Sequence, residues 1–184
     1  MRNNIKIRNY KNIMLNALLL VVIILTIYIS TLLDININNF SDLITIKHPL
    51  IYIWSIICSS YTTISLSIIK KYSKYKLMLL FIYLNLIIFI PYNPTNNMMF
   101  SQIHIIIAFF GFIYLLNNLL YEVYYLNLYK GTHHKTTVLL FLIMCFLLYY
   151  LYFDANMVNI KFQLVFILLY TIILRLIVSS KSSS

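Results

Sequence analysis

Two histidines and an acid are the residues of this chain best suited to acid–base or metal chemistry. Asp42 and His48 lie close together in the sequence, and His104 lies much further along it. Carboxylate and imidazole groups can together bind a metal ion, polarise a water molecule or hold a lipid head group. No H-E-x-x-H or comparable motif supports a metal or catalytic site. We therefore assign no catalytic residue and no metal ligand, and treat Asp42, His48 and His104 as candidate ligand- or partner-binding residues.

A second polar group lies within residues 49–69, whose sequence is PLIYIWSIICSSYTTISLSII. Ser55, Ser59 and Thr62 or Thr63 repeat at intervals of three or four residues, so they share one face of a helix. Small hydroxylated residues let helices approach closely and hydrogen-bond to each other in a bilayer. We interpret this face as a packing surface at the centre of a bundle. The alternative is a polar pocket in which Ser55, Ser59 and Thr62 contact a ligand.

Long apolar helices must position these residues. The chain has 62% hydrophobic and 10% charged residues among 184, whereas a soluble domain has about 25% charged residues. A bilayer core of about 30 Å requires about 20 helical residues. The sequence therefore predicts an all-α fold, a polytopic transmembrane bundle of six helices within one integral membrane domain, residues 1–184. The expected spans are residues 13–33, 49–69, 77–92, 103–121, 136–153 and 162–179.

Two of these spans need comment. The third is the weakest, because Pro91 closes an apolar stretch that is shorter than usual. A tilted neighbour, local thinning of the bilayer or extension of the span to Asn97 would accommodate it. The first is longer than the apolar core of a typical signal peptide and lacks an A-x-A-like cleavage site, so we expect it to remain as a signal anchor.

The basic residues predict the orientation. Once the six spans are threaded, twelve of the fourteen Lys and Arg residues lie on one side, and only Lys47 and Lys161 lie on the other. Lys and Arg are retained in the cytoplasm during insertion, so both termini are expected to be cytoplasmic. Three of the four acids fall on the opposite side, and Glu122 is the exception.

The net charge of +10 does not indicate nucleic-acid binding, because the basic residues lie at the ends of apolar stretches. Basic residues beside a membrane attract anionic lipids by about 1 kcal/mol each, so we expect contact with anionic lipids at the cytoplasmic face. Cys58 and Cys145 lie inside apolar stretches without C-x-x-C spacing, and we expect neither a disulfide nor a cofactor. Arg175 interrupts the last span, where its guanidinium is expected to extend to the lipid head groups.

Residues 38–115 resemble a known family. They contain NNFSDL in the first loop, His48-Pro49 at the start of the second span, and IPYNPTNNMMFSQIHIIIAFFGFIYL at residues 90–115. This stretch is similar to the six-span membrane proteins grouped with the Frag, DRAM and Sfk proteins and their uncharacterised bacterial relatives. The last two spans show nothing diagnostic. The resemblance implies a non-enzymatic bundle linked to lipid organisation or membrane trafficking, with Asp42 and His104 at the matching positions.

These observations predict a non-catalytic multi-pass protein of the cell (plasma) membrane that binds a lipid or a partner protein within the bilayer. A protective or immunity-type membrane protein belongs to the same class. The alternative is an accessory subunit of a larger membrane complex. A membrane-embedded hydrolase that uses the outer-face Asp and His residues is the least favoured function.

Overall fold

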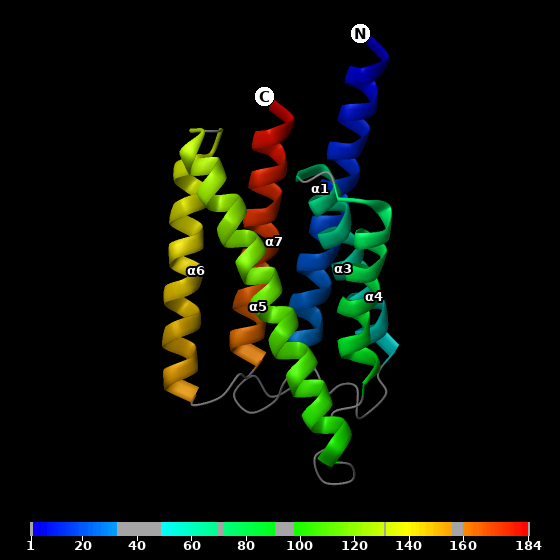
Figure 1. The fold of residues 1–184 in the computed structure, drawn as a ribbon, viewed down its shortest axis with the longest axis vertical. Helices are drawn as coiled ribbons and strands as arrows, with labels where there is room; N and C mark the ends of the chain where they lie inside the picture. The colour runs from blue at the N-terminus through cyan, green and yellow to red at the C-terminus, as the bar shows by residue number, and fades with distance from the viewer. Residues whose placement is uncertain are drawn as a thin grey trace.

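Six α-helices form the part of the chain that the structure describes. This part comprises residues 2–32, 49–69, 72–90, 98–130, 132–155 and 160–183 of the computed structural model. Consecutive helices run in opposite directions, so both termini lie at the same end of the bundle, which we call the terminal end (Figure 1). The prediction of an all-α fold is confirmed. The helices are α1 (Arg2–Ser30), α3 (Pro49–Ile69), α4 (Lys74–Phe89), α5 (Met98–Leu128), α6 (His134–Ala155) and α7 (Ile160–Ser183).

Five of these helices are long and apolar enough to cross a membrane, judged by length and composition. They are α1, α3, α5, α6 and α7, whose apolar segments contain between 19 and 31 residues. Helix α4 has 16 residues, which correspond to about 24 Å at 1.5 Å per residue and are therefore shorter than a bilayer core. The chain is thus a helical, multi-pass type of membrane protein.

The helix ends differ from the predicted spans for local physical reasons. Helix α3 has the predicted bounds, residues 49–69. Helix α4 begins after Ser73, whose hydroxyl accepts a hydrogen bond from the Lys76 amide, and ends at Phe89. The predicted span extended to residue 92, but Ile90 has an extended backbone (ψ 115°) because a residue before proline disfavours the helical conformation. Helix α5 is longer at both ends than the predicted 103–121.

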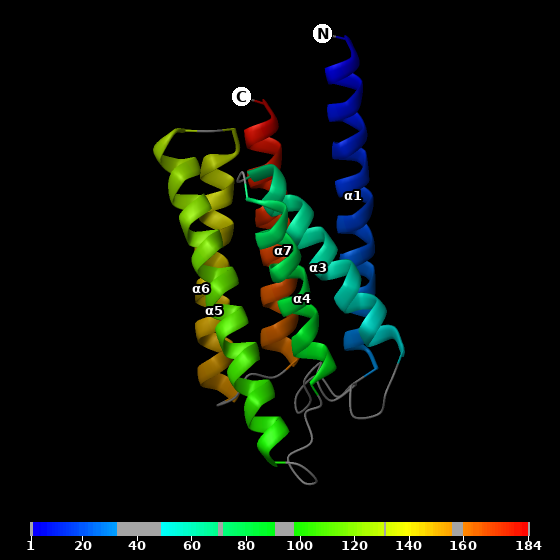
Figure 2. The ribbon, with the colours of Figure 1, turned by 45° about the vertical axis from the view of Figure 1, so that its right-hand side comes forward.

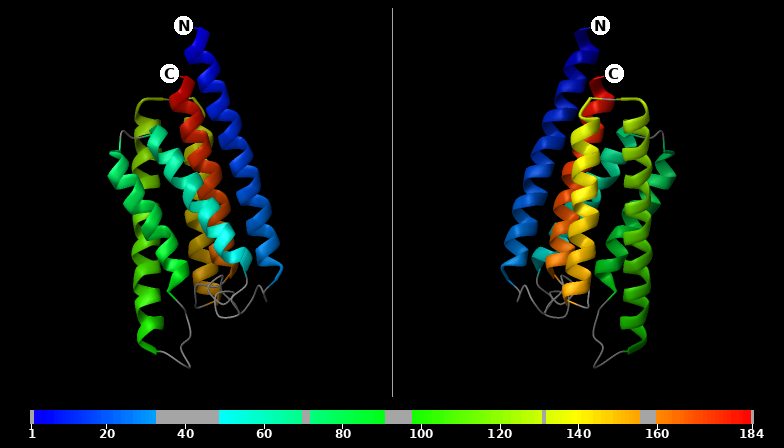
Figure 3. Two further views of the ribbon diagram at one scale, coloured as in Figure 1. Left: turned by 90° about the vertical axis from the view of Figure 1, so that its right-hand side faces the viewer. Right: turned by 90° about the vertical axis from the view of Figure 1, so that its left-hand side faces the viewer.

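Helix α7 forms the centre of the bundle. It packs against α1, α3, α5 and α6, and Figure 3 shows it between α1 and α6. The residues that it buries include Tyr170, Ile173, Leu174 and Ile177. Helix α4 lies at the outside, where it contacts mainly α3 and α5 (Figure 2). A peripheral helix with few neighbours leaves space beside it, and a groove lies there between α4 and α5.

Side-chain hydrogen bonds join the helices inside the apolar bundle. The Trp54 indole of α3 donates to the Thr26 hydroxyl of α1 at 2.9 Å. The Tyr61 hydroxyl of α3 donates to the Thr171 carbonyl of α7 at 2.9 Å. Polar groups in hydrocarbon need partners within the protein, so these bonds fix α3 against α1 and α7.

Candidate functional site

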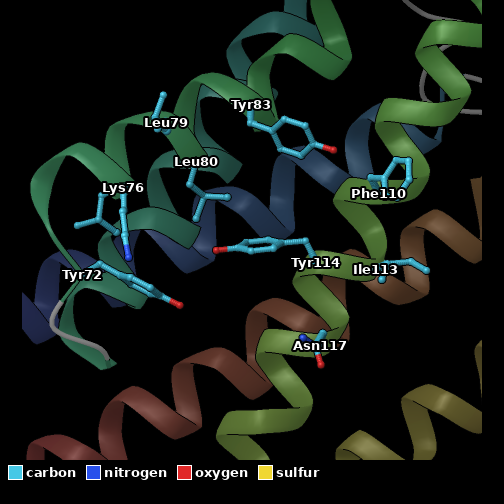
Figure 4. A pocket seen from close by; sticks show the side chains of 10 residues that line it. Tyr72, Lys76, Leu79, Leu80, Tyr83, Phe110, Ile113, Tyr114 and Asn117 are labelled. Atoms are coloured by element: carbon cyan, nitrogen blue, oxygen red, sulfur yellow. The ribbon is translucent and has the colours of Figure 1, made fainter.

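A groove of about 600 Å³ lies between α4 and α5. Its size is within the range of about 300–1,000 Å³ that is typical of small-molecule sites. Figure 4 shows Tyr114 reaching from α5 toward α4, with Tyr72 and Lys76 at one end of the groove and Tyr83 and Phe110 at the other. The lining residues are Tyr72, Lys76, Leu77, Leu79, Leu80, Tyr83, Phe110, Ile113, Tyr114 and Asn117.

Contacts between the two helices define the ends of this groove. Near the end that Tyr83 and Phe110 line, Gly111 allows α5 to approach α4 closely. A Cβ atom at this position would lie 3.0 Å from Cδ1 of Ile87 and 3.4 Å from the Tyr83 ring. The Tyr83 hydroxyl also donates to the Ile107 carbonyl at 2.7 Å. At the other end, the Tyr72 hydroxyl donates to the Asn118 side chain at 3.1 Å. The groove is the space between these two sets of contacts.

The groove combines an apolar wall with one polar end. Leu79 and Ile113 are both 46% exposed on its two sides, so its wall is accessible from the surroundings of the bundle. Lys76 is exposed near the start of α4, toward the terminal end. An apolar groove with a cation at one end matches the chemistry of an amphiphile, whose tail is apolar and whose head group is anionic.

The structure places the predicted serine face of α3 against α4. The Ser55 hydroxyl donates to the Asn85 side-chain oxygen at 3.0 Å, and the Asn85 side-chain nitrogen donates to the Ser59 hydroxyl at 2.8 Å and to the Phe81 carbonyl at 2.8 Å. Both serines and Asn85 are buried, and so is Thr62. Ser55 and Ser59 therefore meet around one amide, away from the α4–α5 groove.

The structure describes only part of the predicted group of Asp42, His48 and His104. Asp42 and His48 lie outside the described residues. His104 is 6% exposed, and its Nδ1 lies 2.9 Å from the Ile90 carbonyl. A carbonyl can only accept, so Nδ1 carries the proton in this contact. His104 therefore bonds to the backbone just after the last turn of α4.

An ion pair joins three helices at the terminal end. The Lys181 ammonium of α7 lies 2.9 Å from a carboxylate oxygen of Glu122 on α5, and it also donates to the Ile69 carbonyl at the end of α3 at 3.2 Å. The Glu122 side chain is 2% exposed and that of Lys181 is 37% exposed. Glu122, the exception to the charge pattern, thus has a cation from a distant part of the sequence.

Arg175 points partly into the protein. Its Nε donates to the Asn16 side-chain oxygen of α1 at 2.7 Å, and one terminal nitrogen is buried. The expectation that the guanidinium extends to the head groups omitted this contact with α1. The sequence signal for such a contact was a polar residue inside an apolar span, because a polar group requires a partner there. Asn85 and Asn118 gave the same signal.

The described residues contain no group of three or more His, Cys, Asp or Glu side chains that could hold a metal ion. Cys58 and Cys145 are free thiols, and each is half-buried. Within the described ranges, the chemistry of the α4–α5 groove is thus limited to hydroxyls, an amide and one ammonium group.

No known protein family, curated protein or solved structure matches this chain.

Proposed function

We propose that this protein binds a lipid with an anionic head group in the groove between α4 and α5, without a chemical reaction. The observation that carries this proposal is the groove itself, with its leucine and aromatic walls and Lys76 at one end. The acyl chain contacts the wall, and the head group lies beside Lys76, near the terminal end. Coulomb attraction between an anionic lipid and a basic residue at the membrane surface contributes about 1 kcal/mol.

The proposal includes a topology of six spans with both termini in the cytoplasm, in the plasma membrane. Two observations support it. Twelve of the fourteen Lys and Arg residues fall on one side when six spans are threaded, and both termini lie at one end of the bundle (Figure 1). Helix α4 then crosses as a short span, with local thinning of the bilayer around it. The relationship to Frag, DRAM and Sfk-like proteins stays a prediction, and lipid binding is compatible with it.

Reporter fusions test the topology. Fusions after Lys74 and Lys135 are expected to report a cytoplasmic position, because the preceding helices end on the basic side. Fusions after Asn97 and Asp154 are expected to report an external position. An enzyme reporter active on only one side of the membrane provides the measurement. An inverted result at any one of the four positions contradicts six spans.

Photo-crosslinking tests the lipid site. The protein is reconstituted with a diazirine-labelled anionic phospholipid or its zwitterionic counterpart, and labelled peptides are identified by mass spectrometry. Labelling by the anionic lipid is expected to concentrate on α4 and α5. Lys76→Gln should reduce it about fivefold, which corresponds to the loss of about 1 kcal/mol. Ile113→Trp should block the groove and reduce labelling by both lipids.

Two variants serve as matched controls. Lys135→Gln removes an exposed cation at the same end of the bundle, and Ile143→Trp enlarges an exposed isoleucine of α6, away from the groove. Neither should change the labelling of α4 and α5. Equal labelling of all helices would contradict the proposed site. An equal loss of labelling in Lys76→Gln and Lys135→Gln would also contradict it, because it would show that the anionic lipid is attracted to the basic surface in general.

A further inference from the structure

Four side chains form the polar end of the α4–α5 groove. Tyr72 lies just before α4 and Lys76 lies in its first turn, while Tyr114 and Asn117 lie on successive turns of α5. All four line the same groove, and in Figure 4 the Tyr114 hydroxyl points toward Tyr72 and Lys76. A molecule in the groove therefore meets one ammonium group, two phenols and one amide, and these groups decide which head group fits.

Two groups at the polar end require a hydrogen-bond donor from the ligand. The Asn117 side chain is exposed within the apolar span Met98–Leu128, and no described residue bonds to it. Its neighbour Asn118 accepts a bond from the Tyr72 hydroxyl and donates to the Tyr114 carbonyl. An amide without a partner in apolar surroundings is unfavourable, and the Tyr72 oxygen, whose proton goes to Asn118, can only accept from a ligand. A phosphate oxygen supplies no such donor.

The charge at the polar end limits the ligand further. Lys76 is the one charged side chain among the described lining residues, and none of them is an acid. One ammonium group balances the single negative charge of a phosphodiester, whereas a phosphomonoester carries about 1.5–2 charges at pH 7. A head group with its own ammonium, such as serine or ethanolamine, would place a second cation beside Lys76, and like charges repel strongly where water is scarce. An uncharged hydroxyl is the donor that fits both conditions.

We propose that the groove selects a phospholipid with one phosphodiester charge and an uncharged, hydroxyl-bearing head group such as glycerol. This inference rests on the lipid site proposed above and names the class of lipid that occupies it. The phosphate lies beside Lys76. The head-group hydroxyls donate to the side-chain oxygens of Asn117 and Tyr72 and accept from the Asn117 amide nitrogen. The acyl chain lies along the groove wall at Leu79 and Ile113.

Competition for the groove tests the head group. The protein is reconstituted with diazirine-labelled phosphatidylglycerol, and unlabelled lipids are added in increasing mole fraction while the labelling of α4 and α5 is followed by mass spectrometry. Phosphatidylglycerol should halve the labelling at an about tenfold lower mole fraction than phosphatidylserine, which has the same net charge, because roughly one or two hydrogen bonds separate them. Phosphatidic acid, which lacks the head-group alcohol, should compete no better than phosphatidylserine.

The two ways in which this experiment can fail are distinguishable. If labelled phosphatidylglycerol reacts equally with all helices, the groove is not a lipid site, and the proposed function fails together with this inference. If the labelling concentrates on α4 and α5 but phosphatidylserine or phosphatidic acid competes as well as phosphatidylglycerol, the lipid site stands and the head-group inference is wrong.

Two substitutions of Asn117 test its part in the selectivity. Asn117→Asp keeps the shape of the side chain and adds a carboxylate that can pair with an ammonium group, so phosphatidylserine should compete at least as well as phosphatidylglycerol. Asn127→Asp makes the same change at an exposed position of α5 that does not line the groove, and it should keep the tenfold preference.

Asn117→Leu keeps the test valid if the aspartate variant does not fold. It removes the amide without leaving a polar atom unpaired, and the preference for phosphatidylglycerol should fall to about threefold or less, because one set of hydrogen bonds to the head group is lost. An unchanged preference in either folded Asn117 variant overturns the proposal.

Discussion

Replacing Lys181 with methionine is expected to lower the free energy of unfolding by about 2–3 kcal/mol. The substitution leaves the carboxylate of Glu122, whose side chain is 2% exposed, without its cation, and breaking a buried pair in this way costs about 3–5 kcal/mol when both groups are fully buried. We expect less because Lys181 is 37% exposed, so solvent already screens part of the interaction. SDS-induced unfolding in mixed micelles measures the difference.

The converse substitution should have a smaller effect. Glu122→Gln leaves an ammonium group that can reach solvent and can still donate to the Ile69 carbonyl at the C-terminus of α3. That carbonyl belongs to the negative end of the helix dipole, so Lys181 keeps a favourable partner. The double variant should lose less than the sum of the two single variants, since residues that share one interaction are not additive.

Lys135→Met is the control for this cycle. Lys135 is an exposed lysine in the first turn of α6, and its substitution should change the free energy of unfolding by less than about 0.5 kcal/mol. If Lys181→Met matches this control, then the Glu122 carboxylate has access to water, and the three-helix contact at the terminal end adds little to stability.

Apolar length was enough to predict most of the fold. Residues 49–69 form a helix with the predicted bounds because Pro49 suits the first helical position and the apolar stretch fills a span. Hydropathy does not indicate where a helix continues into polar sequence. Helix α5 therefore extends to Leu128, well beyond the predicted residue 121, through Glu122 and a run of tyrosines. The six-span count and the orientation stay predictions for the fusion experiment.

The candidate groove could not be predicted from the sequence because no local pattern encodes it. Its position depends on where α4 and α5 approach each other at Gly111, and on a hydrogen bond from Tyr72 to Asn118 across 46 positions. The Glu122–Lys181 pair spans 59 positions. The sequence did provide one usable signal: a polar side chain within an apolar span needs a partner, although only the packing identifies which one.

Asn85 provides the clearest case of such a side chain, and Asn85→Asp is expected to lower the free energy of unfolding by about 2–3 kcal/mol. The two side chains have nearly the same shape, so packing is kept. The aspartate cannot donate to Ser59 or to the Phe81 carbonyl as the amide does, and it adds a charge to the middle of α4, where insertion of an acid costs about 2.5–3.5 kcal/mol. SDS-induced unfolding again gives the value.

Removing all the side chains of the network around Asn85 distinguishes the cost of the added charge from the cost of the lost hydrogen bonds. Asn85→Leu with Ser55→Ala and Ser59→Ala should be close to neutral, because replacing all partners by apolar groups leaves no polar atom unpaired. Asn127→Asp, at an exposed position near the end of α5, should also have little effect. If Asn85→Asp is as stable as the wild type, the α3–α4 interface must admit water. In that case the serine face of α3 would line a polar pocket, which is the alternative predicted for Ser55, Ser59 and Thr62 from their spacing.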